Sequence, residues 1–590
     1  SDVCSSDLTT RTHTCGELNS NDINASVILN GWVNSVRLHG QVIFVDLRDR
    51  YGKTQIVFNS EDYSGDFEVA KKLSMEDVLS ISGTVKARDT GAVNPDLSTG
   101  EIEVIVSEME MLNEAAPLPF LVTDRSSAEE DLRLKYRYLE LRTDELQENL
   151  KIRHEAYQAV RTYLSDKNFM EVETPVLMKS TPEGARDYLV PSRIHEGKFY
   201  ALPQSPQIYK QILMIGGFDR YFQIVKCFRD EDLRADRQPE FTQIDIEMSF
   251  VEEDDILSAM ENLTQHVFKS VKGIELPTPF PRLTYDESLN RFGSDKPDTR
   301  FGMELIDMKS ITDASEFNAF KSAEMVKGIA VMGGAKYSRK NIETFTEFVK
   351  NYKAKGLAWM KVETETLTGG ISKFFSEGLQ KELIKSAELK DGDILFLIGD
   401  SAKVTLSALG ALRTEIGKQE TLADESEFKP VWITEFPMFE KEGNRYSALH
   451  HPFTAPQEED IEKLDSDPAS ASSRAYDLTI NGYEIAGGSI RNHQPKVQEK
   501  IFELLGMDES EAKDRFGFLV EALKYGTPPH GGIAFGFDRL VMLLAGTANI
   551  RDVIAFPKTT SAASLMDEAP SSVSKEQLDE LHIQSKPSKK

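Results

Sequence analysis

Charged residues that could bind a phosphorylated ligand lie between positions 228 and 247. Arg229 opens an Arg–Asp–Glu run, and Asp245 and Glu247 follow near the end of the segment. The planar guanidinium of an arginine can pair with two phosphate oxygens at once. Two strands joined by a loop that carries Arg229 could therefore cradle a triphosphate, and the two carboxylates would share one face because they are two residues apart. Taken alone, the Arg–Asp–Glu run is more typical of a solvated ionic turn.

A glycine-rich stretch at residues 532–540, Gly-Ile-Ala-Phe-Gly-Phe-Asp-Arg-Leu, could receive a flat ligand. Glycine has no Cβ, so a ligand can approach the backbone of such a strand closely. Arg539 would stand at the start of the following helix, where its guanidinium can stack on an aromatic base. A glycine-kinked core strand followed by an exposed arginine is the alternative interpretation.

The elements that must hold these groups can be predicted from periodicity and punctuation. Apolar residues recur at helical spacing over residues 144–167, which predicts a long helix. A strand is predicted at 169–175, where Pro175 would close it as an edge strand. Strands are also predicted at 221–226 and 241–250, on either side of the charged loop.

The first hundred residues alternate short β-rich runs with turns. The runs lie at 27–33, 42–48, 54–58, 78–86 and 101–106, and a short helical stretch at 67–73 follows the third run. Five strands with a helix after the third is the order of an OB barrel, a fold that often binds single-stranded nucleic acid. Any other small β-barrel would fit the strand count equally well.

Composition shifts along the chain predict an α+β multidomain fold. Residues 1–8 are interpreted as a non-native leader, and the predicted parts are then an OB barrel (9–115), a hinge (116–142), the first part of a catalytic domain (143–292), an inserted α+β domain (293–428), the second part of the catalytic domain (429–570) and a tail (571–590) that is expected to fray.

Charge and cysteine content narrow the function classes. The chain of 590 residues has 69 Lys and Arg against 97 Asp and Glu, a net charge of -28. This excludes nonspecific coating of nucleic acid through a global basic field, but not RNA binding by a local face. Three scattered cysteines without a CxxC pair predict neither a disulfide framework nor a zinc cage. Without an apolar run of about 18 residues or a hydrophobic leader, the expectation is a cytoplasmic enzyme and no membrane partner.

Three elements, at 169–175, 228–247 and 532–540, resemble in order the three signature motifs of class II aminoacyl-tRNA synthetases. The resemblance implies a catalytic domain built on an antiparallel sheet. It implies that the proline motif builds a homodimer interface and that the other two motifs bind ATP. The chain has no GxGxxG or Walker loop, which agrees with this class.

The finer resemblance, over about residues 12–569, is to bacterial-type aspartyl-tRNA synthetases. Matching strings stand at 181–188, 204–207 with Lys210, 228–247, 449–454 and 483–491, and the inserted unit matches the insertion of the bacterial subgroup. The implied reaction joins L-aspartate and ATP into aspartyl-adenylate and then transfers aspartate to the 3′ end of tRNA-Asp. Arg229 would be the catalytic residue at the bond that forms.

The same resemblance implies the substrate-binding residues. Lys210 and Arg491 would bind the side-chain carboxylate of aspartate, because two cations select a carboxylate over an amide. The aspartate site as a whole would comprise Glu183, Ser205, Gln207, Lys210, Arg229, Asp245, His450 and Arg491, with Glu183 in a closing loop and with Ser205, Gln207 and Asp245 at the ammonium end.

ATP would contact Arg229, Asp230, Glu231, Gln238, Glu484, Gly536, Phe537, Asp538 and Arg539. Mg²⁺ would be held on the phosphates by Asp477 and Glu484, because carboxylate oxygens are the ligands that this hard cation prefers. A zinc site is not expected at His450 and His451, because adjacent histidines do not easily share one metal.

The barrel would recognise the tRNA anticodon through Arg37, Phe44 and Gln55. Phe44 would stack on a base and Gln55 would hydrogen-bond a base edge. His39 and Gly91 resemble residues of family members that charge both tRNA-Asp and tRNA-Asn, which leaves tRNA-Asn open as a second acceptor. Three alternatives also stay open: an asparagine synthetase, a lysine synthetase and a noncatalytic tRNA-binding relative.

Overall fold

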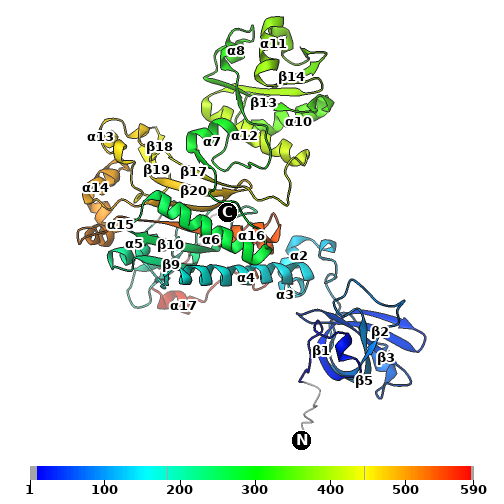
Figure 1. Ribbon diagram of the computed structural model, residues 1–590. Coiled ribbons are helices and arrows are strands. Elements are labelled where there is room, and N and C mark those ends of the chain that lie inside the picture. Colours follow the sequence, from blue (N-terminus) through cyan, green and yellow to red (C-terminus); the bar gives the residue numbers. More distant parts are fainter. Residues whose placement is uncertain (1–9, 182–183, 444, 587–590) are drawn as a thin grey trace. The chain divides into compact units, whose positions relative to one another are not determined.

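A closed β-barrel occupies the N-terminal part of the computed structural model, which describes residues 10–181, 184–443 and 445–586. Its strands are β1 (Ser26–His39), β2 (Val42–Arg48), β3 (Lys53–Asn59), β4 (Val78–Ala87) and β5 (Ile102–Asn113), in the order β1-β2-β3-β5-β4. Helix α1 (Phe67–Ala70) follows β3 (Figure 1). Alternate residues such as Ile43, Val45 and Leu47 fill the interior because successive side chains of a strand point to opposite faces. The five-strand OB order is confirmed.

Two compact units divide the chain. One comprises residues 1–151 and 555–571, and the other comprises 152–554 and 572–590. In the first unit, η3 (Arg125–Ser127), α2 (Glu130–Lys135) and α3 (Arg137–Glu140) follow the barrel. Arg125, Arg133 and Arg137 all pair with the fully buried carboxylate of Glu140, at 2.6, 2.5 and 2.5 Å. This ion cluster holds the segment predicted as a hinge in a defined conformation.

The second unit contains an eight-stranded sheet in the order β11-β17-β20-β21-β22-β10-β9-β6. The strands are β6 (Met170–Glu171), β9 (Arg220–Phe228), β10 (Glu240–Ser249), β11 (Arg282–Thr284), β17 (Pro430–Thr434), β20 (Ala475–Ile480), β21 (Tyr483–Ile490) and β22 (His530–Gly536). Neighbours are antiparallel except for the two edge pairs, β11 with β17 and β6 with β9. The strand predicted over 169–175 is therefore short, because β6 contains only two residues.

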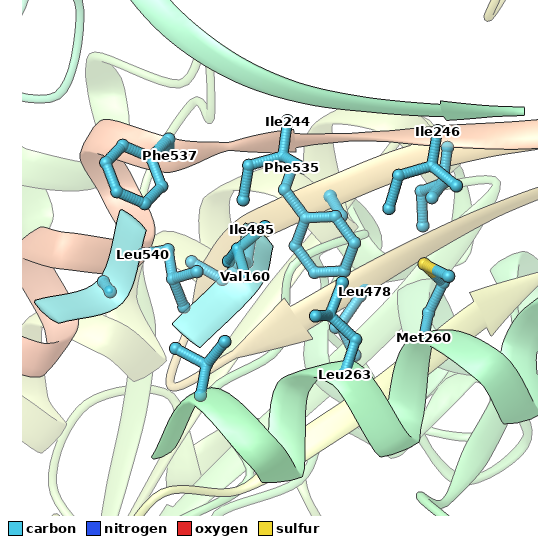
Figure 2. Packing of buried hydrophobic residues seen from close by; sticks show 14 of the residues in the cluster. Val160, Ile244, Ile246, Met260, Leu263, Leu478, Ile485, Phe535, Phe537 and Leu540 are labelled. Atoms are coloured by element: carbon cyan, nitrogen blue, oxygen red, sulfur yellow. The ribbon is translucent and has the colours of Figure 1, made fainter. Parts of the chain in front are cut away.

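Helices α4 (Asp144–Asp166), α6 (Glu253–Lys272) and α16 (Phe537–Ala545) pack on one face of this sheet. Figure 2 shows Ile244 and Ile246 of β10 in the resulting core, with Leu263 of α6 and Val160 of α4. Because Ile244 and Ile246 point into this core, the residues between and after them on β10 point to the opposite face. That opposite face carries the charged residues described below.

Residues 293–428 contain a second sheet with cores of its own. Its strands run in the order β12-β13-β16-β14-β15: β12 (Ile306–Asp307), β13 (Met325–Val331), β14 (Ala358–Glu363), β15 (Thr366–Thr368) and β16 (Ile394–Asp400). One core lies with α10 (Arg339–Lys350) and α12 (Ala402–Gln419), and another with α8 (Lys309–Asp313), α9 (Asn318–Lys321) and α11 (Glu377–Ser386). The sheet and helices are the α+β composition predicted for this segment.

The remaining elements surround the main sheet or lie at the C-terminal end. They are α5 (Gln207–Ile215), α7 (Tyr285–Phe292), α13 (Lys463–Ser466), α14 (Pro495–Leu504), α15 (Glu509–Ala522) and α17 (Lys575–Glu580), with the hairpins β7 (Leu189–Pro191) with β8 (Phe199–Ala201) and β18 (Phe439–Glu442) with β19 (Arg445–Ala448). Within the segment predicted as a tail, Ser574 caps α17. None of the helices in the described part of the chain has both the length and the apolar character that a membrane crossing requires.

Candidate active site

Strand β10 places two carboxylates at the centre of the face opposite the helices. Asp245 pairs in register with Ala534 of β22, and Glu247 pairs with Gly532. A Cβ on Gly532 would stand 2.0 Å from Oε2 of Glu247, so only glycine fits beside this carboxylate. The glycine predicted to admit a ligand at position 532 is thus required by a buried side chain of the protein itself.

Four charged side chains form a buried cluster around these carboxylates. Lys210 of α5 places Nζ 3.1 Å from Oδ1 of Asp245 and 3.5 Å from Oε2 of Glu247. Arg491 donates from Nε to Oε1 of Glu247 at 2.8 Å and from Nη1 to Oγ of Ser489 at 2.7 Å. All four charged residues are at most 4% exposed. The structure therefore brings together Lys210, Asp245 and Arg491, as the resemblance implies.

The pKa values of the two carboxylates in the cluster are shifted in opposite directions. Burial raises the pKa of Asp245 above its ordinary value, and the nearby ammonium of Lys210 only partly opposes this. Burial acts on Glu247 in the same way, but Arg491 and Lys210 outweigh it and lower the pKa of Glu247. Glu247 is thus the permanent counterion of the two cations, whereas an approaching positive charge would favour the ionised form of Asp245.

Some polar atoms around the cluster have no hydrogen-bond partner within the described residues. They include Oδ2 of Asp245 and Nε2 of Gln207, both buried. Buried polar atoms are normally satisfied, so two such atoms beside a charged cluster indicate a place for a polar ligand. Oδ2 of Asp245 is an acceptor suited to an ammonium group. Nε2 of Gln207 is a donor, so the predicted contact of Gln207 with an ammonium group would need its amide oxygen. Ser205 accepts a hydrogen bond from the backbone amide of Gln207 at 3.2 Å.

The loop between β9 and β10 carries the residues predicted to bind ATP. The guanidinium of Arg229 lies 5.0 Å from the ring centroid of Phe241, and the backbone amide of Arg229 donates to the carbonyl of Pro239 at 2.9 Å. Glu231 pairs with Arg237 at 3.3 Å. Gln238 is buried at the end of the loop. The aromatic contact leaves the guanidinium of Arg229 half-buried at the mouth of the loop.

Arg539 faces this loop from the start of α16. Its Nη2 donates to Asp236 at 3.1 Å, and its Nη1 donates to the backbone carbonyl of Glu484 at 3.0 Å. Gly536 precedes α16, and a Cβ there would be in ordinary contact with its surroundings, 3.7 Å from the carbonyl oxygen of Ile485. Arg229, Arg539 and Gly536 thus fit a nucleotide that lies across β21 and β22.

Asp477 and Glu484 form a second carboxylate pair next to the nucleotide residues. A Cβ on Gly487 would lie 2.7 Å from Oδ1 of Asp477, so only glycine fits beside this carboxylate. Carboxylates are hard oxygen donors, and this pair suits a magnesium ion whose remaining ligands are phosphates and water. The described residues contain no group of three or more metal-ligating side chains. A magnesium site here would therefore depend on ligands from ATP.

His450 lies beside this pair, with Nε2 3.2 Å from Oδ1 of Asp477. Burial acts to lower the pKa of His450, but Asp477 outweighs burial and raises it. Burial raises the pKa of Asp477 against the opposing charge of His450. His450 was predicted to touch aspartate, and its Nδ1 is buried with no partner in the described part of the chain. That atom is the one still available for a substrate.

The barrel brings the predicted anticodon residues onto one outer face. Arg37 of β1 pairs in register with Phe44 of β2, and Phe44 pairs with Val57 of β3. The guanidinium of Arg37 donates to the amide oxygen of Gln55 at 3.2 Å, and Gln55 donates to Glu103 at 2.9 Å. The half-buried ring of Phe44 thus lies next to a polar network, which is suited to stacking a base and reading its edge.

His39 and Gly91, the predicted discrimination residues, are both exposed in the same unit. His39 ends β1, just before the turn at Gly40, whose φ is 60°. A Cβ on Gly91 would meet open space. Neither position is required by packing, so both are free to serve recognition.

Comparisons with known proteins match both parts of the chain. A family model described as tRNA synthetases class II (D, K and N) matches residues 129–560, and a model of the OB-fold nucleic acid binding domain matches 27–112. The chain belongs to the class II tRNA synthetases. Among curated relatives of this class II chain, Aspartate--tRNA(Asp/Asn) ligase of Anoxybacillus flavithermus is 54% identical over 98% of each chain. Aspartate--tRNA ligase of Halalkalibacterium halodurans is 55% identical over 97% of this chain and 98% of its own.

Solved structures of class II synthetases share the fold. Asparaginyl-tRNA synthetase from Pyrococcus horikoshii, complexed with asparaginyl-adenylate, gives a TM-score of 0.59 at 20% identity, over 93% of this chain and 98% of its own. Aspartyl tRNA synthetase from Entamoeba histolytica gives 0.57 at 21% identity, over 92% and 90%. At these identities the likeness establishes the fold alone. The resemblance to aspartyl-tRNA synthetases is confirmed by the curated relatives.

Two residues predicted to bind ATP in this class II synthetase have side chains with structural roles. The ring of Phe537 is fully buried in the core, 4.3 Å from the ring of Tyr157. The carboxylate of Asp538 accepts from Arg153 at 2.7 Å and from the backbone amide of Thr242 at 2.8 Å. Both side chains thus fasten α16 to α4 and β10, whereas the neighbouring Arg539 faces the loop between β9 and β10.

The loop predicted to close over aspartate is described only in part. Glu183 lies outside the described residues. In the described part of the loop that follows Glu183, Arg186 pairs with Asp230 at 3.6 Å, and the carbonyl of Ala185 accepts a hydrogen bond from Gln204 at 2.8 Å. Asp230 therefore contacts this loop, and its direct contact with ATP stays a prediction.

Sequence reasoning missed three residues of the synthetase site. Glu247 was placed on the correct face by its spacing from Asp245, but it was given no role. Asp236 and Lys296 pair with Arg539 and Glu484, respectively. Asp236 stands within the loop already singled out, so a charge count of that loop could have found it. Lys296 lies 188 residues from Glu484, and no local pattern marks it.

Proposed function

We propose that this chain is an aspartate–tRNA ligase, an enzyme that activates L-aspartate with ATP to aspartyl-adenylate and transfers aspartate to the 3′ end of tRNA-Asp. The observation that carries the proposal is the buried pair of cations, Lys210 of α5 and Arg491, which follows β21, beside the carboxylates of β10. Buried cations bind a carboxylate well and an amide poorly, because the amide leaves their charge uncompensated. A lysine substrate would bring a third cation to this place.

The first step is nucleophilic attack by the α-carboxylate of aspartate on the α-phosphorus of ATP, with pyrophosphate leaving. Arg229 is the catalytic residue, because its guanidinium neutralises charge that develops on the phosphate. Asp245 would bind the substrate ammonium through its unpartnered Oδ2. The attacking carboxylate is already ionised at neutral pH, so this step needs no general base. The main contribution of the protein is to hold both reactants in line.

The cofactor of this proposal is Mg²⁺ bound with ATP. When bound, it supplies positive charge to the phosphate oxygens. Asp477 and Glu484 would hold it, because carboxylate oxygens are the ligands that this hard cation prefers.

In the second step a hydroxyl of the terminal ribose of the tRNA attacks the carbonyl carbon of aspartyl-adenylate, the ester forms and AMP leaves. The barrel would bind the anticodon through Phe44, Gln55 and Arg37, while the acceptor end reaches the main sheet. His39 and Gly91 support a second acceptor, tRNA-Asn, and the relative named Aspartate--tRNA(Asp/Asn) ligase is consistent with this. Aminoacylation of purified tRNA-Asp and tRNA-Asn side by side tests the proposal. Charging of tRNA-Asp is required, and failure to charge tRNA-Asn would remove only the second acceptor.

A homodimer in the cytoplasm completes the proposal. The proline motif presents exposed apolar side chains, Met170, Val176 and Leu177. Such side chains so close together are typical of an interface with another copy. Cys15 and Cys227 are not joined in a disulfide, which fits a reducing compartment. Light scattering of the purified protein would give twice the chain mass, and a monomer at micromolar concentration would refute the dimer.

A further inference from the structure

The loop at residues 293–302 brings a lysine into the ATP half of the site. Nζ of Lys296 lies 2.7 Å from Oε2 of Glu484, and the same oxygen is 4.0 Å from Nη1 of Arg539. The side chains of Lys296 and Glu484 are 39% and 33% exposed, so the ammonium group remains accessible to a ligand. This loop stands where the chain leaves α7 and enters the second sheet.

The second sheet's longest helix fixes the loop from one side. Arg413 of α12 is 1% exposed, and its Nη2 donates to the carbonyls of Asp298, Phe301 and Gly302 at 2.9, 2.8 and 2.8 Å. Its guanidinium also lies 4.2 Å from the ring centroid of Phe301. A buried arginine with three backbone carbonyls as acceptors leaves this end of the loop little freedom.

Helix α7 fixes the loop from the other side. The backbone amide of Lys296 donates to Oγ of Ser294 at 3.0 Å, and the carbonyl of Ser294 accepts from Ser288 of α7 at 2.7 Å. Asp298 also lies close to Gly482, in the turn between β20 and β21, where an added Cβ would stand 3.4 Å from the Cβ of Asp298. Lys296 is therefore held at the nucleotide side of the sheet by contacts on both flanks.

The simpler explanation is that Lys296 and Glu484 form an ordinary surface ion pair, which contributes about 0–1 kcal/mol to the stability of the fold. Three features of its surroundings favour a ligand role. Glu484 belongs to the carboxylate pair with Asp477, the loop that carries Lys296 is fixed from both sides, and Arg539 is the neighbouring cation. A triphosphate concentrates more negative charge than Arg229 and Arg539 can neutralise. A third cation beside them would therefore pair with the remaining charge on the phosphates.

We propose that Lys296 is a third cation of the ATP site, one that contacts the polyphosphate, and that Arg413 is the positioning residue through which the inserted segment holds it there. The inference rests on the proposed function and deepens it. It gives the segment at 293–428 a part in nucleotide binding, because the loop that carries Lys296 is fastened to α12.

The test is calorimetric titration of the full-length protein with ATP and magnesium, in the absence of amino acid and tRNA. Lys296→Met removes the charge and keeps much of the volume, and should weaken the Kd for ATP about tenfold, the size of one lost charge-assisted contact. Lys296→Arg should stay close to the wild type. Lys336→Met, which removes a surface ion pair to Glu420 in the same segment, is the matched control and should change nothing.

Unchanged or tighter ATP binding by Lys296→Met would overturn the inference, because Lys296 would then be only a partner of Glu484 or a competitor for its carboxylate. Titration with L-aspartate separates this result from misfolding, since the pocket of Lys210 and Arg491 should bind aspartate equally well in the variant. A wild-type protein that binds no ATP would instead overturn the proposed function itself.

Discussion

Arg491 donates two hydrogen bonds to Glu247, from Nε to Oε1 at 2.8 Å and from Nη2 to Oε2 at 3.1 Å. The same carboxylate lies 3.5 Å from the ammonium of Lys210. Glu247 thus joins the two cations of the proposed aspartate pocket before any substrate is bound. Both partners are buried, so the loss of either one leaves a charge without compensation.

Glu247→Gln should therefore destabilise the catalytic unit. Removing one partner of a buried ion pair costs about 3–5 kcal/mol, so the unfolding midpoint in thermal denaturation should fall clearly below that of the wild type. Glu275→Gln is the matched control, because Glu275 is an exposed carboxylate that pairs with Lys269 on the surface. An unchanged midpoint in Glu247→Gln would show that the cluster does not organise the pocket.

Arg491→Leu should abolish the activation of aspartate and leave ATP binding largely intact. The variant removes one of the two cations of the pocket but touches no residue on the nucleotide side. Aspartate-dependent exchange of pyrophosphate into ATP measures the first property, and calorimetry measures the second. Arg491→Lys keeps the charge without the planar fork and should retain partial activity. Exchange near the wild-type rate in Arg491→Leu would refute the pocket.

Phe44→Ala should weaken tRNA charging and spare adenylate formation. Stacking of one base on an aromatic ring contributes about 1–3 kcal/mol, so the KM for tRNA should rise about tenfold. Phe44→Tyr keeps the ring and should remain close to the wild type. An unchanged KM for tRNA in the alanine variant would remove Phe44 from the anticodon site.

The pH dependence of stability should reveal the ion cluster of Glu140. Burial acts to raise the pKa of Glu140, but Arg137, Arg125 and Arg133 outweigh burial and lower it. Because the folded pKa is lowered, the carboxylate stabilises the fold above the unfolded pKa of about 4.3. This contribution is lost as the pH falls through the folded value.

Glu140→Gln should accordingly lower the unfolding midpoint at pH 7, and the difference from the wild type should shrink as the pH falls below about 4. Thermal unfolding of both proteins across this range checks the sign. A difference that grows toward acid pH would contradict the assignment.

Much of the fold could be predicted from the sequence, because the periodicity of apolar residues and the spacing of charged residues are local properties of the chain. The β-rich run at 42–48 predicts a barrel strand, and the two-residue spacing of Asp245 and Glu247 predicts their shared face. The strand at 169–175 was overestimated, because only Met170 and Glu171 find a neighbour in the sheet. Backbone pairing at a sheet edge depends on the partner strand, which a local pattern does not contain.

The structure gives different surroundings to the members of one string that matched the family. Arg539 faces the nucleotide side, yet its neighbours Phe537 and Asp538 turn into the core toward Tyr157 and Arg153. Successive residues at the start of a helix point in different directions, so a motif does not assign one role to all its members. Lys296 could not be found at all, since its place beside Glu484 depends on how the second sheet folds.

Selective activation of aspartate is tested most directly by amino-acid-dependent exchange of pyrophosphate into ATP, measured with the purified wild-type protein. Aspartate, asparagine and lysine would be compared at equal concentration with magnesium present. We expect rapid exchange with aspartate and background exchange with the other two, because Lys210 and Arg491 require a carboxylate. Exchange that asparagine or lysine supports as well as aspartate, or no exchange with aspartate, would contradict it.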